Sequence, residues 1–135
     1  MNYWLIKTDP ETYSWDDLKK ESSTSWDGIR NYAARNHMKA MKNGDKVLVY
    51  HSGGESEIRG LATVTKEFYQ DPTTEEIAWV SVGIKANNSL KKNISLQEIK
   101  KNNKLKNMLL IKISRLSVMP VSEDEFNTII ELSED

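Results

Sequence analysis

The amino-acid sequence predicts a single α+β domain over residues 1–135, built on a small, twisted and partly closed β-barrel of five or six strands with flanking helices. Two patterns indicate this class. Short β-prone runs follow one another along most of the chain, and helical patterns are inserted after the first run and near the end. The length is sufficient for one hydrophobic core, and the sequence contains no repeat, linker or low-complexity segment.

The expected strands are aromatic, β-branched or aliphatic runs that end at turn residues. The first covers residues 3–7 and stops before Pro10, since proline donates no hydrogen bond to a ladder. Later strands are expected over residues 46–51, 58–68, 77–85, 107–114 and 118–120. Residues 21–25 and 87–89 are polar and are predicted to form loops.

Four helices are expected from their start signals and periodicity. Ser14 is predicted to cap a helix that ends near residue 20, and Ser95 and Ser122 each begin a capping-box pattern. The remaining helix covers residues 30–42 and ends at Asn43-Gly44. Its inward face carries Ala34, Met38 and Met41, and its polar and basic outer face carries Asn31, Arg35, Lys39 and Lys42.

The composition excludes several classes of protein. The chain has no cysteine, which excludes disulfides, thiolate metal sites and a thiol nucleophile, and two histidines are too few for most zinc sites. No apolar run approaches the ~20 residues of a membrane span, and no signal peptide is recognisable. We therefore expect a cytoplasmic monomer without a metal, a cofactor or a membrane partner. The net charge of −1 requires any nucleic-acid site to be a local patch.

Residues 26–36 combine an indole, two guanidinium groups, amides and a phenol at the predicted start of a helix. A stacking ring and hydrogen-bonding edges suit a planar ligand, and the amides at a helix N-terminus favour an adjacent phosphate. Simpler interpretations of these residues are also consistent with the sequence. Trp26 is equally consistent with a core position, Asp27 with a helix N-cap, and Arg30 and Arg35 with solvated surface charges.

Two strand ends carry further candidate residues. Thr8 and Asp9 follow the first strand, and Tyr50, His51 and Ser52 lie where another strand ends, so both groups can converge on one pocket mouth. His51 is interpreted as a hydrogen-bonding residue rather than a general base, because no carboxylate stands at a spacing that implies a dyad. Candidate phosphate contacts are Arg30, Lys39, Lys42, Lys91 and Lys92. No catalytic motif is present.

The chain resembles the EVE domain family of the PUA-like superfamily. The similarity rests on five stretches in the family's order and spacing: Tyr3 to Pro10, Trp26 to Asn36, Val49 to Ser52, Lys106 to Met108 and Ser114 to Pro120. The resemblance implies a PUA-like pseudobarrel of five or six strands. It also implies a relation to YTH domains, which hold a methylated RNA base in an aromatic cage, and recognition of a modified base in nucleic acid.

The resemblance also implies a set of ligand-binding residues. Trp26 would be the stacking wall, with Lys7, Thr8, Asp9, Asn31, Tyr32, Arg35, Tyr50, His51, Ser52, Arg115 and Ser117 around the ligand. The ligand would be a base flipped out of the helix, with modified cytosine in DNA favoured over RNA, and the domain would not be catalytic. The chain departs from the family pattern at Asp9, where glutamate is frequent, and at Met119, where glutamine is frequent.

Two other functions are consistent with the residues. In the first, the chain is a base- or nucleotide-processing enzyme of an ASCH-like type, with Asp9 or His51 as acid or base. In the second, it is a small-ligand-binding domain whose pocket never meets a polymer. Salt dependence separates the second from a nucleic-acid reader, because phosphate contacts make affinity fall as salt rises.

Overall fold

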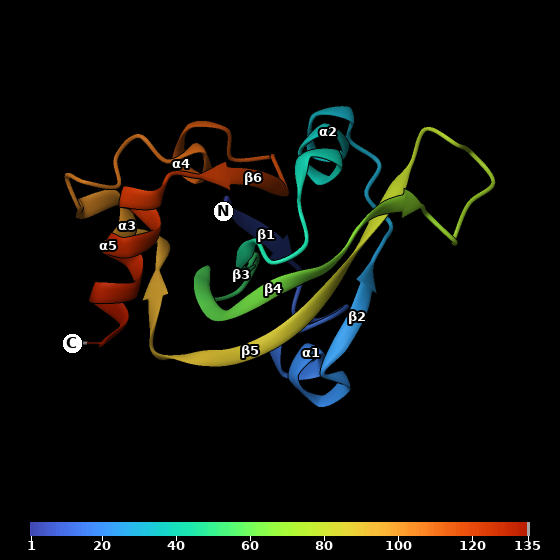
Figure 1. The fold of residues 1–135 in the computed structure, drawn as a ribbon. Coiled ribbons are helices and arrows are strands. Elements are labelled where there is room, and N and C mark those ends of the chain that lie inside the picture. Colours follow the sequence, from blue (N-terminus) through green and yellow to red (C-terminus); the bar gives the residue numbers. More distant parts are fainter. Residues whose placement is uncertain (135) are drawn as a thin grey trace.

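A computed structural model describes residues 1–134 and is organised around one six-stranded sheet in the order β2-β5-β4-β3-β1-β6 (Figure 1). The central strands β1 and β3 run parallel, and every other neighbouring pair is antiparallel. The strands are β1 (Tyr3–Thr8), β2 (Ser23–Trp26), β3 (Lys46–His51), β4 (Glu57–Gln70), β5 (Val80–Ser95) and β6 (Val118–Val121).

The helices are α1 (Trp15–Glu21), α2 (Tyr32–Ala40), α3 (Leu96–Lys101), α4 (Leu109–Lys112) and α5 (Glu123–Glu134). The predicted caps are confirmed. The Ser14 and Ser95 side chains accept hydrogen bonds from the backbone N–H of the third helical residue, Asp17 or Glu98. The carboxylate of that third residue in turn accepts from the backbone N–H of the serine. Ser122 makes the same reciprocal pair with Glu125, at 3.0 and 3.1 Å. Local sequence therefore determines where these helices begin.

The predicted α+β class with up to six strands is confirmed, but the sheet is not closed into the predicted barrel. β2 and β6 form its two edges and do not pair with each other. Instead, α2 spans the opening, with contacts to β6 on one side and to β4 and β5 on the other. Ala34, Met38 and Met41 fill this space as part of the core. Side-chain packing from a helix thus replaces the strand pairing that closure would need.

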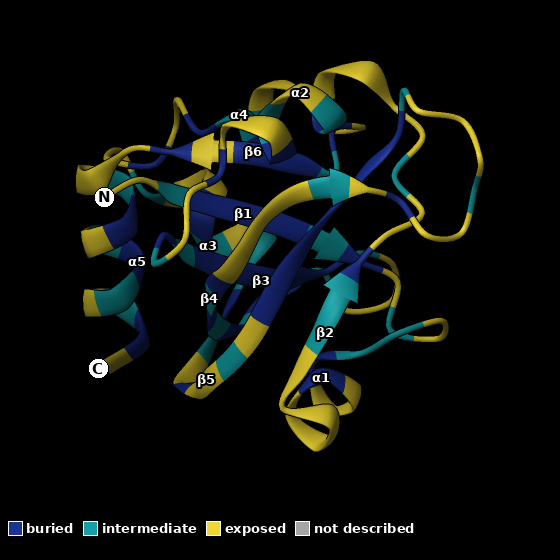
Figure 2. Ribbon diagram, turned by 45° about the vertical axis from the view of Figure 1, so that its right-hand side comes forward, coloured by how far each residue is buried: buried dark blue, intermediate teal, exposed yellow. Residues whose placement is uncertain are grey.

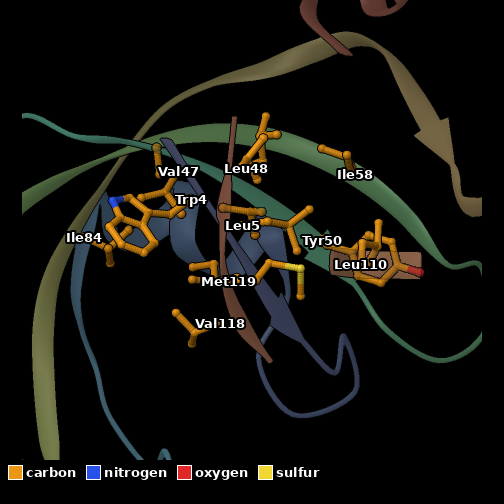
Figure 3. Close-up of a cluster of buried hydrophobic side chains, with 14 of the residues drawn as sticks. Trp4, Leu5, Val47, Leu48, Tyr50, Ile58, Ile84, Leu110, Val118 and Met119 are labelled. Atoms are coloured by element: carbon orange, nitrogen blue, oxygen red, sulfur yellow. The ribbon is translucent and has the colours of Figure 1, made fainter. Parts of the chain in front are cut away.

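The core surrounds β1 and β3, in which consecutive residues are buried, so both faces of these strands are covered. Figure 3 shows part of this cluster. Leu5 and Leu48 pair across these two strands and are fully buried. Met119 lies opposite Leu5 on β6 and is also fully buried. The position at which the chain departs from the family's glutamine is therefore a core position in this molecule.

Three predicted segments differ in the structure. Residues 21–25 were expected to form a loop, but Ser23–Trp26 pairs with β5. Residues 87–89 were also expected to form a loop, but β5 continues through them as the partner of β4. Residues 107–114 were expected to form a strand, but α4 forms there, with Met108 and Leu110 buried. Each of these results depends on a distant partner rather than on the segment's own composition.

Three predicted boundaries also differ: both ends of one helix and the start of one strand lie inside the predicted ranges. The helix expected over residues 30–42 is limited to Tyr32–Ala40, because Asn31 serves as its N-cap and Met41 is already extended. The strand expected from residue 77 begins at Val80, and the residues before it form a turn.

Trp15 fixes α1 against the sheet. Its indole lies on Gly60 so closely that a Cβ added there would be 2.2 Å from the ring. Its indole N–H donates to Ser89 Oγ at 2.8 Å, and its backbone N–H donates to His51 Nε2 at 2.9 Å. The His51 bond is buried and requires a neutral ring with Nε2 unprotonated. This contact positions the turn between β1 and α1.

The stability of the domain is expected to decrease on acidification because of His51. Burial first, and then the Arg59 charge, lower the pKa of His51 below its ordinary value, although Asp16 opposes them. The unfolded chain therefore binds the proton more readily, and stability falls as the pH drops through about 6.5 toward the lower folded-state pKa. Urea denaturation of wild type across this range should show the loss.

The matched comparison uses the other histidine, His37, whose pKa burial also lowers. His51→Ala should cost about 1–3 kcal/mol at neutral pH, because it leaves the Trp15 amide unpaired, and it should flatten the pH dependence. His37→Ala should leave the His51 contribution in place. A His51→Ala protein with the full wild-type slope would contradict this assignment.

Candidate functional site

A cleft of about 650 Å³ opens beside the end of β1 and is called the Trp26 cleft. Its walls all come from residues 7–29, which include the end of β1, the turn that leads to α1, the last residue of α1, and β2 with the residues after it. They contribute Lys7 to Asp9, Thr12, Tyr13, Glu21 and residues 24–29. The volume is within the range of small-ligand sites, which span roughly 300–1,000 Å³.

Two rings form an aromatic corner of the Trp26 cleft. Trp26 ends β2 and is 8% exposed, and Tyr13 meets it edge to face with the ring centroids 5.9 Å apart. The Tyr13 hydroxyl donates to the Glu21 carboxylate. Burial, and then the hydrogen bond to Glu21, raise the pKa of Tyr13 to about 12. The corner therefore presents a neutral phenol and an indole to a planar ligand.

The polar groups of the cleft include both donors and acceptors. The Lys7 ammonium donates to the Ser114 carbonyl at 2.6 Å and lies 5.8 Å from the Tyr50 ring centroid, and burial lowers its pKa. Asp9 accepts a hydrogen bond from the Glu11 amide at 2.9 Å. Burial, and then the charge of Asp71, raise the pKa of Asp27. The cleft can thus offer one cationic donor and several carboxylate acceptors.

Four of the predicted site residues come together in this cleft: Lys7, Thr8, Asp9 and Trp26. Thr8 is buried, and its hydroxyl donates to the Tyr13 carbonyl, which ties the strand end to the aromatic corner. Trp26 belongs to the hydrophobic core cluster and also lines the cleft, so both interpretations of this residue apply.

The residues predicted at the end of β3 lie elsewhere. Tyr50 is buried in the core. His51 faces a second cleft that it shares with Asp9, Asp16 and Arg59. Ser52 donates its backbone N–H to the Thr8 carbonyl at 2.9 Å. The two strand ends do meet, because β1 and β3 pair in parallel, but their surroundings form two clefts, and Asp9 lines both of them.

The residues predicted at the start of α2 also lie outside the lining of the Trp26 cleft. Asn31 is the N-cap, and its Oδ1 accepts from the Ala34 amide at 2.9 Å, so the alternative of Asp27 as the cap was wrong. Tyr32 is 60% exposed. Arg35 donates to the Ala78 carbonyl at 3.1 Å.

The remaining predicted cations are dispersed. Arg30 pairs with Asp71 at 2.9 Å, Lys42 lies 3.8 Å from Glu67, and Lys92 lies 3.4 Å from Glu98. Lys39 lies 5.4 Å from the Phe68 ring centroid. Lys91 is exposed toward the far end of β5.

The last two predicted ligand-binding residues lie on the loop beside Lys7. Arg115 is exposed, and the Ser117 carbonyl accepts the Lys7 backbone N–H at 2.9 Å.

Several lining residues were not among the predicted site residues. Tyr13, Glu21 and Asp27 contribute an aromatic edge and two carboxylates. The sequence around Tyr13 and Glu21 reads as an ordinary helix flank, and their role arises from how α1 is placed beside β2. Gly28 offered a local signal, since Asp-Gly favours a turn, and its φ is 78°.

Two kinds of feature are absent from residues 1–134. This part of the chain contains no cluster of three or more His, Asp or Glu side chains placed to hold a metal ion. None of its helices combines the length and hydropathy needed to cross a lipid bilayer.

The sequence model of the EVE domain family matches residues 2–132 of this chain. Human thymocyte nuclear protein 1 is 34% identical over 167 aligned positions, which include 98% of this chain and 74% of the human protein. The corresponding protein of Danio rerio is 32% identical, over 96% of this chain and 71% of its own length. The human alignment is longer than this chain of 135 residues, so that relative carries residues without a counterpart here.

Solved structures are similar to this chain over nearly its whole length. A hypothetical protein from Leishmania major has a TM-score of 0.94 at 40% identity, covering 99% of this chain and 95% of that one. Human THYN1 protein, in complex with 5-methylcytosine containing DNA, has a TM-score of 0.93 at 33% identity. The match covers 100% of this chain and 99% of that one. The YTH domain of Zygosaccharomyces rouxii MRB1 shares the fold, with a TM-score of 0.65 at 8% identity. The match covers 98% of this chain and 86% of that one. This chain belongs to the EVE domain family.

Proposed function

We propose that this chain is a non-catalytic reader that binds a modified base of DNA, a methylated cytosine, flipped out of its stack into the Trp26 cleft. The observation that carries the proposal is the aromatic corner of Trp26 and Tyr13 beside Lys7 and the carboxylates. The complex of the human relative with 5-methylcytosine containing DNA supports the choice of ligand.

The hydrogen-bonding groups of the cleft match the edge of cytosine. Cytosine presents an exocyclic amine, which can donate a hydrogen bond to a carboxylate, and a ring carbonyl, which can accept a hydrogen bond from an ammonium. Asp27 or Asp9 fits the first role and Lys7 the second. Thymine has a carbonyl in place of the amine, and that carbonyl would face a carboxylate. This repulsion provides selection against thymine.

Stacking and methyl contacts supply the remaining selectivity. Flipping a base costs a few kcal/mol, and stacking on one ring recovers about 1–3 kcal/mol. A methyl group that fills apolar space contributes about 1–3 kcal/mol through pocket fit alone. We therefore expect the preference for methylated over unmodified cytosine to be about 5- to 100-fold.

The structure offers less support for catalysis. The Nε2 of His51 accepts the backbone N–H of Trp15, so a general-base role would require this buried bond to break. His51 also faces the second cleft rather than the Trp26 cleft. Of the two residues considered as acid or base, His51 is therefore poorly placed for that role.

The first test measures affinity for duplexes that differ at one base. Wild type should bind a 5-methylcytosine duplex more tightly than its cytosine and thymine counterparts, as measured by fluorescence anisotropy at fixed salt. Trp26→Ala should reduce this affinity about 5- to 100-fold. Because Trp26 also packs in the core, thermal melts must establish that the variant is folded.

Outcomes of this test distinguish the alternatives. Equal affinity for all three duplexes would overturn the reader. Equal affinity for free 5-methyldeoxycytidine and for the duplex, with little response to salt, would indicate a small-ligand site. Turnover of the bound base would indicate an enzyme.

The second test uses Asp27, whose substitution by asparagine preserves the side chain's shape. If the ionised carboxylate accepts the cytosine amine, affinity should fall as the pH decreases from neutrality toward the raised pKa of Asp27. Asp27→Asn should bind more weakly at neutral pH and depend less on pH. Asp16→Asn, outside the Trp26 cleft, is the matched control and should behave as wild type. An unchanged pH profile in Asp27→Asn would exclude this role for Asp27.

A further inference from the structure

Four side chains form a second aromatic and cationic surface beside the Trp26 cleft, called here the Tyr32 platform: Arg30, Tyr32, Arg35 and Trp79. The Tyr32 and Trp79 ring centroids are 4.9 Å apart, with an angle of 36° between the planes. An arginine guanidinium lies near each ring. Arg30 lies 5.7 Å from the Trp79 ring centroid, and Arg35 lies 5.0 Å from that of Tyr32.

The platform has a buried floor and an exposed surface. Trp79 is 8% exposed and lies outside the main hydrophobic cluster of residues 1–134. Its indole N–H donates to Glu76 at 2.9 Å, which fixes the orientation of the ring. Tyr32, by contrast, is 60% exposed. Figure 2 shows the turn between β4 and β5 and the start of α2 as largely exposed segments.

The two guanidinium groups are oriented by fixed acceptors. Arg30 donates to the buried Asp71 carboxylate at 2.9 Å and to the Thr73 hydroxyl at 3.1 Å. Arg35 donates to the Ala78 carbonyl at 3.1 Å and to the Asn36 amide oxygen at 2.8 Å. The acceptors of Arg35 are neutral, so its positive charge is retained at the surface, whereas Asp71 balances that of Arg30.

The platform and the Trp26 cleft share a structural element. Gly28 lines the cleft, and its backbone N–H donates to the same oxygen of Asp71 that binds Arg30, at 2.8 Å. The rim of the cleft is therefore held directly against the platform. A polymer with one residue in the cleft would bring its neighbour to this surface.

We propose that the Tyr32 platform is a second nucleic-acid subsite, in which Tyr32 stacks on the base next to the one in the Trp26 cleft and Arg35 contacts a flanking phosphate. This proposal deepens the proposed function and rests on it. An exposed ring with an adjacent uncompensated guanidinium suits a base and its phosphate, because every base offers a π-face and stacking tolerates any sequence. The adjacent base loses a stacking partner when its neighbour flips, and Tyr32 would replace that partner.

The contacts on their own also admit a purely structural role, in which the four side chains join α2 to the turn before β5. Tyr32 separates the two roles, because most of its surface contacts solvent and its removal leaves the bonds of Arg30 to Asp71 and of Arg35 to Ala78 available. A structural role predicts a loss of stability in Tyr32→Ala. A stacking role predicts a loss of affinity without one.

The test combines a protein variant with a DNA variant in a double-mutant cycle. Wild type and Tyr32→Ala are titrated against a 5-methylcytosine duplex and against two duplexes with an abasic site immediately 5′ or 3′ of the methylcytosine. Tyr32→Ala should bind the intact duplex about 5- to 100-fold more weakly than wild type. One abasic site should weaken wild type similarly but affect Tyr32→Ala little, because both changes remove the same contact.

The control variants are available within the chain. Phe68→Ala removes another half-exposed ring with a nearby cation, Lys39, and should leave affinity unchanged. Tyr32→Phe keeps the stacking face and should bind as wild type does. Arg35→Gln should reduce the dependence of affinity on salt, as the loss of one phosphate contact requires.

The outcomes separate this proposal from the proposed function. Wild-type affinity in Tyr32→Ala, or strictly additive effects with both abasic duplexes, would overturn the platform and leave the Trp26 cleft unaffected. Coupling between Tyr32 and an abasic site in duplexes that show no preference for methylcytosine would support the platform while overturning the proposed reader. Equal thermal melts for wild type and Tyr32→Ala are required of the stacking role, and a large loss of stability would instead support the structural role.

Discussion

The buried carboxylate of Asp71 holds together the surface on which both candidate sites depend. Its side chain is fully buried and accepts hydrogen bonds from Gly28, from Arg30 and from the amide and hydroxyl of Thr73. Burial alone would raise the pKa of Asp71, but these hydrogen bonds outweigh burial and hold it well below its usual range. A buried ionised group is tolerated only when it is paired and fully hydrogen-bonded. The geometry of Gly28 and Arg30 is therefore strongly constrained, and Asp71 fixes the rim of the Trp26 cleft relative to the Tyr32 platform.

The charge of the Trp26 cleft indicates which part of a nucleic acid can enter it. Three carboxylates, those of Asp9, Glu21 and Asp27, line the cleft together with one ammonium, that of Lys7. A phosphate would be repelled by these carboxylates, whereas an uncharged ring with an exocyclic amine would find acceptors. A polymer ligand must then place its phosphates on other surfaces. Arg35, whose hydrogen-bond acceptors are neutral, is suited to that role, so the two surfaces have complementary tasks in the proposed complex.

The sequence could predict features that short-range interactions determine. The helix starts at Ser14, Ser95 and Ser122 depend on bonds within three residues, and the structure has all three. β2, the middle of β5 and α4 were missed because long-range pairing and burial decide them. The same division applies to the candidate site. Thr8, Asp9 and Trp26 lie at strand ends or in an unusual stretch of sequence, whereas the contact between Asp71 and Gly28 joins residues 43 positions apart.

The difference between predicted and observed placement at residues 26–36 has a physical cause. The sequence concentrates a ring, two arginines and amides in one stretch, which suggested a single pocket wall. In the structure the chain turns at Gly28, where φ is 78°, and Asn31 is used as a helix cap. Trp26 therefore remains with β2 and the Trp26 cleft, while Tyr32 and Arg35 project from α2 toward Trp79 and Ala78. One continuous motif thus contributes to two adjacent surfaces, and this arrangement would allow a single short segment to engage both a flipped base and its neighbour.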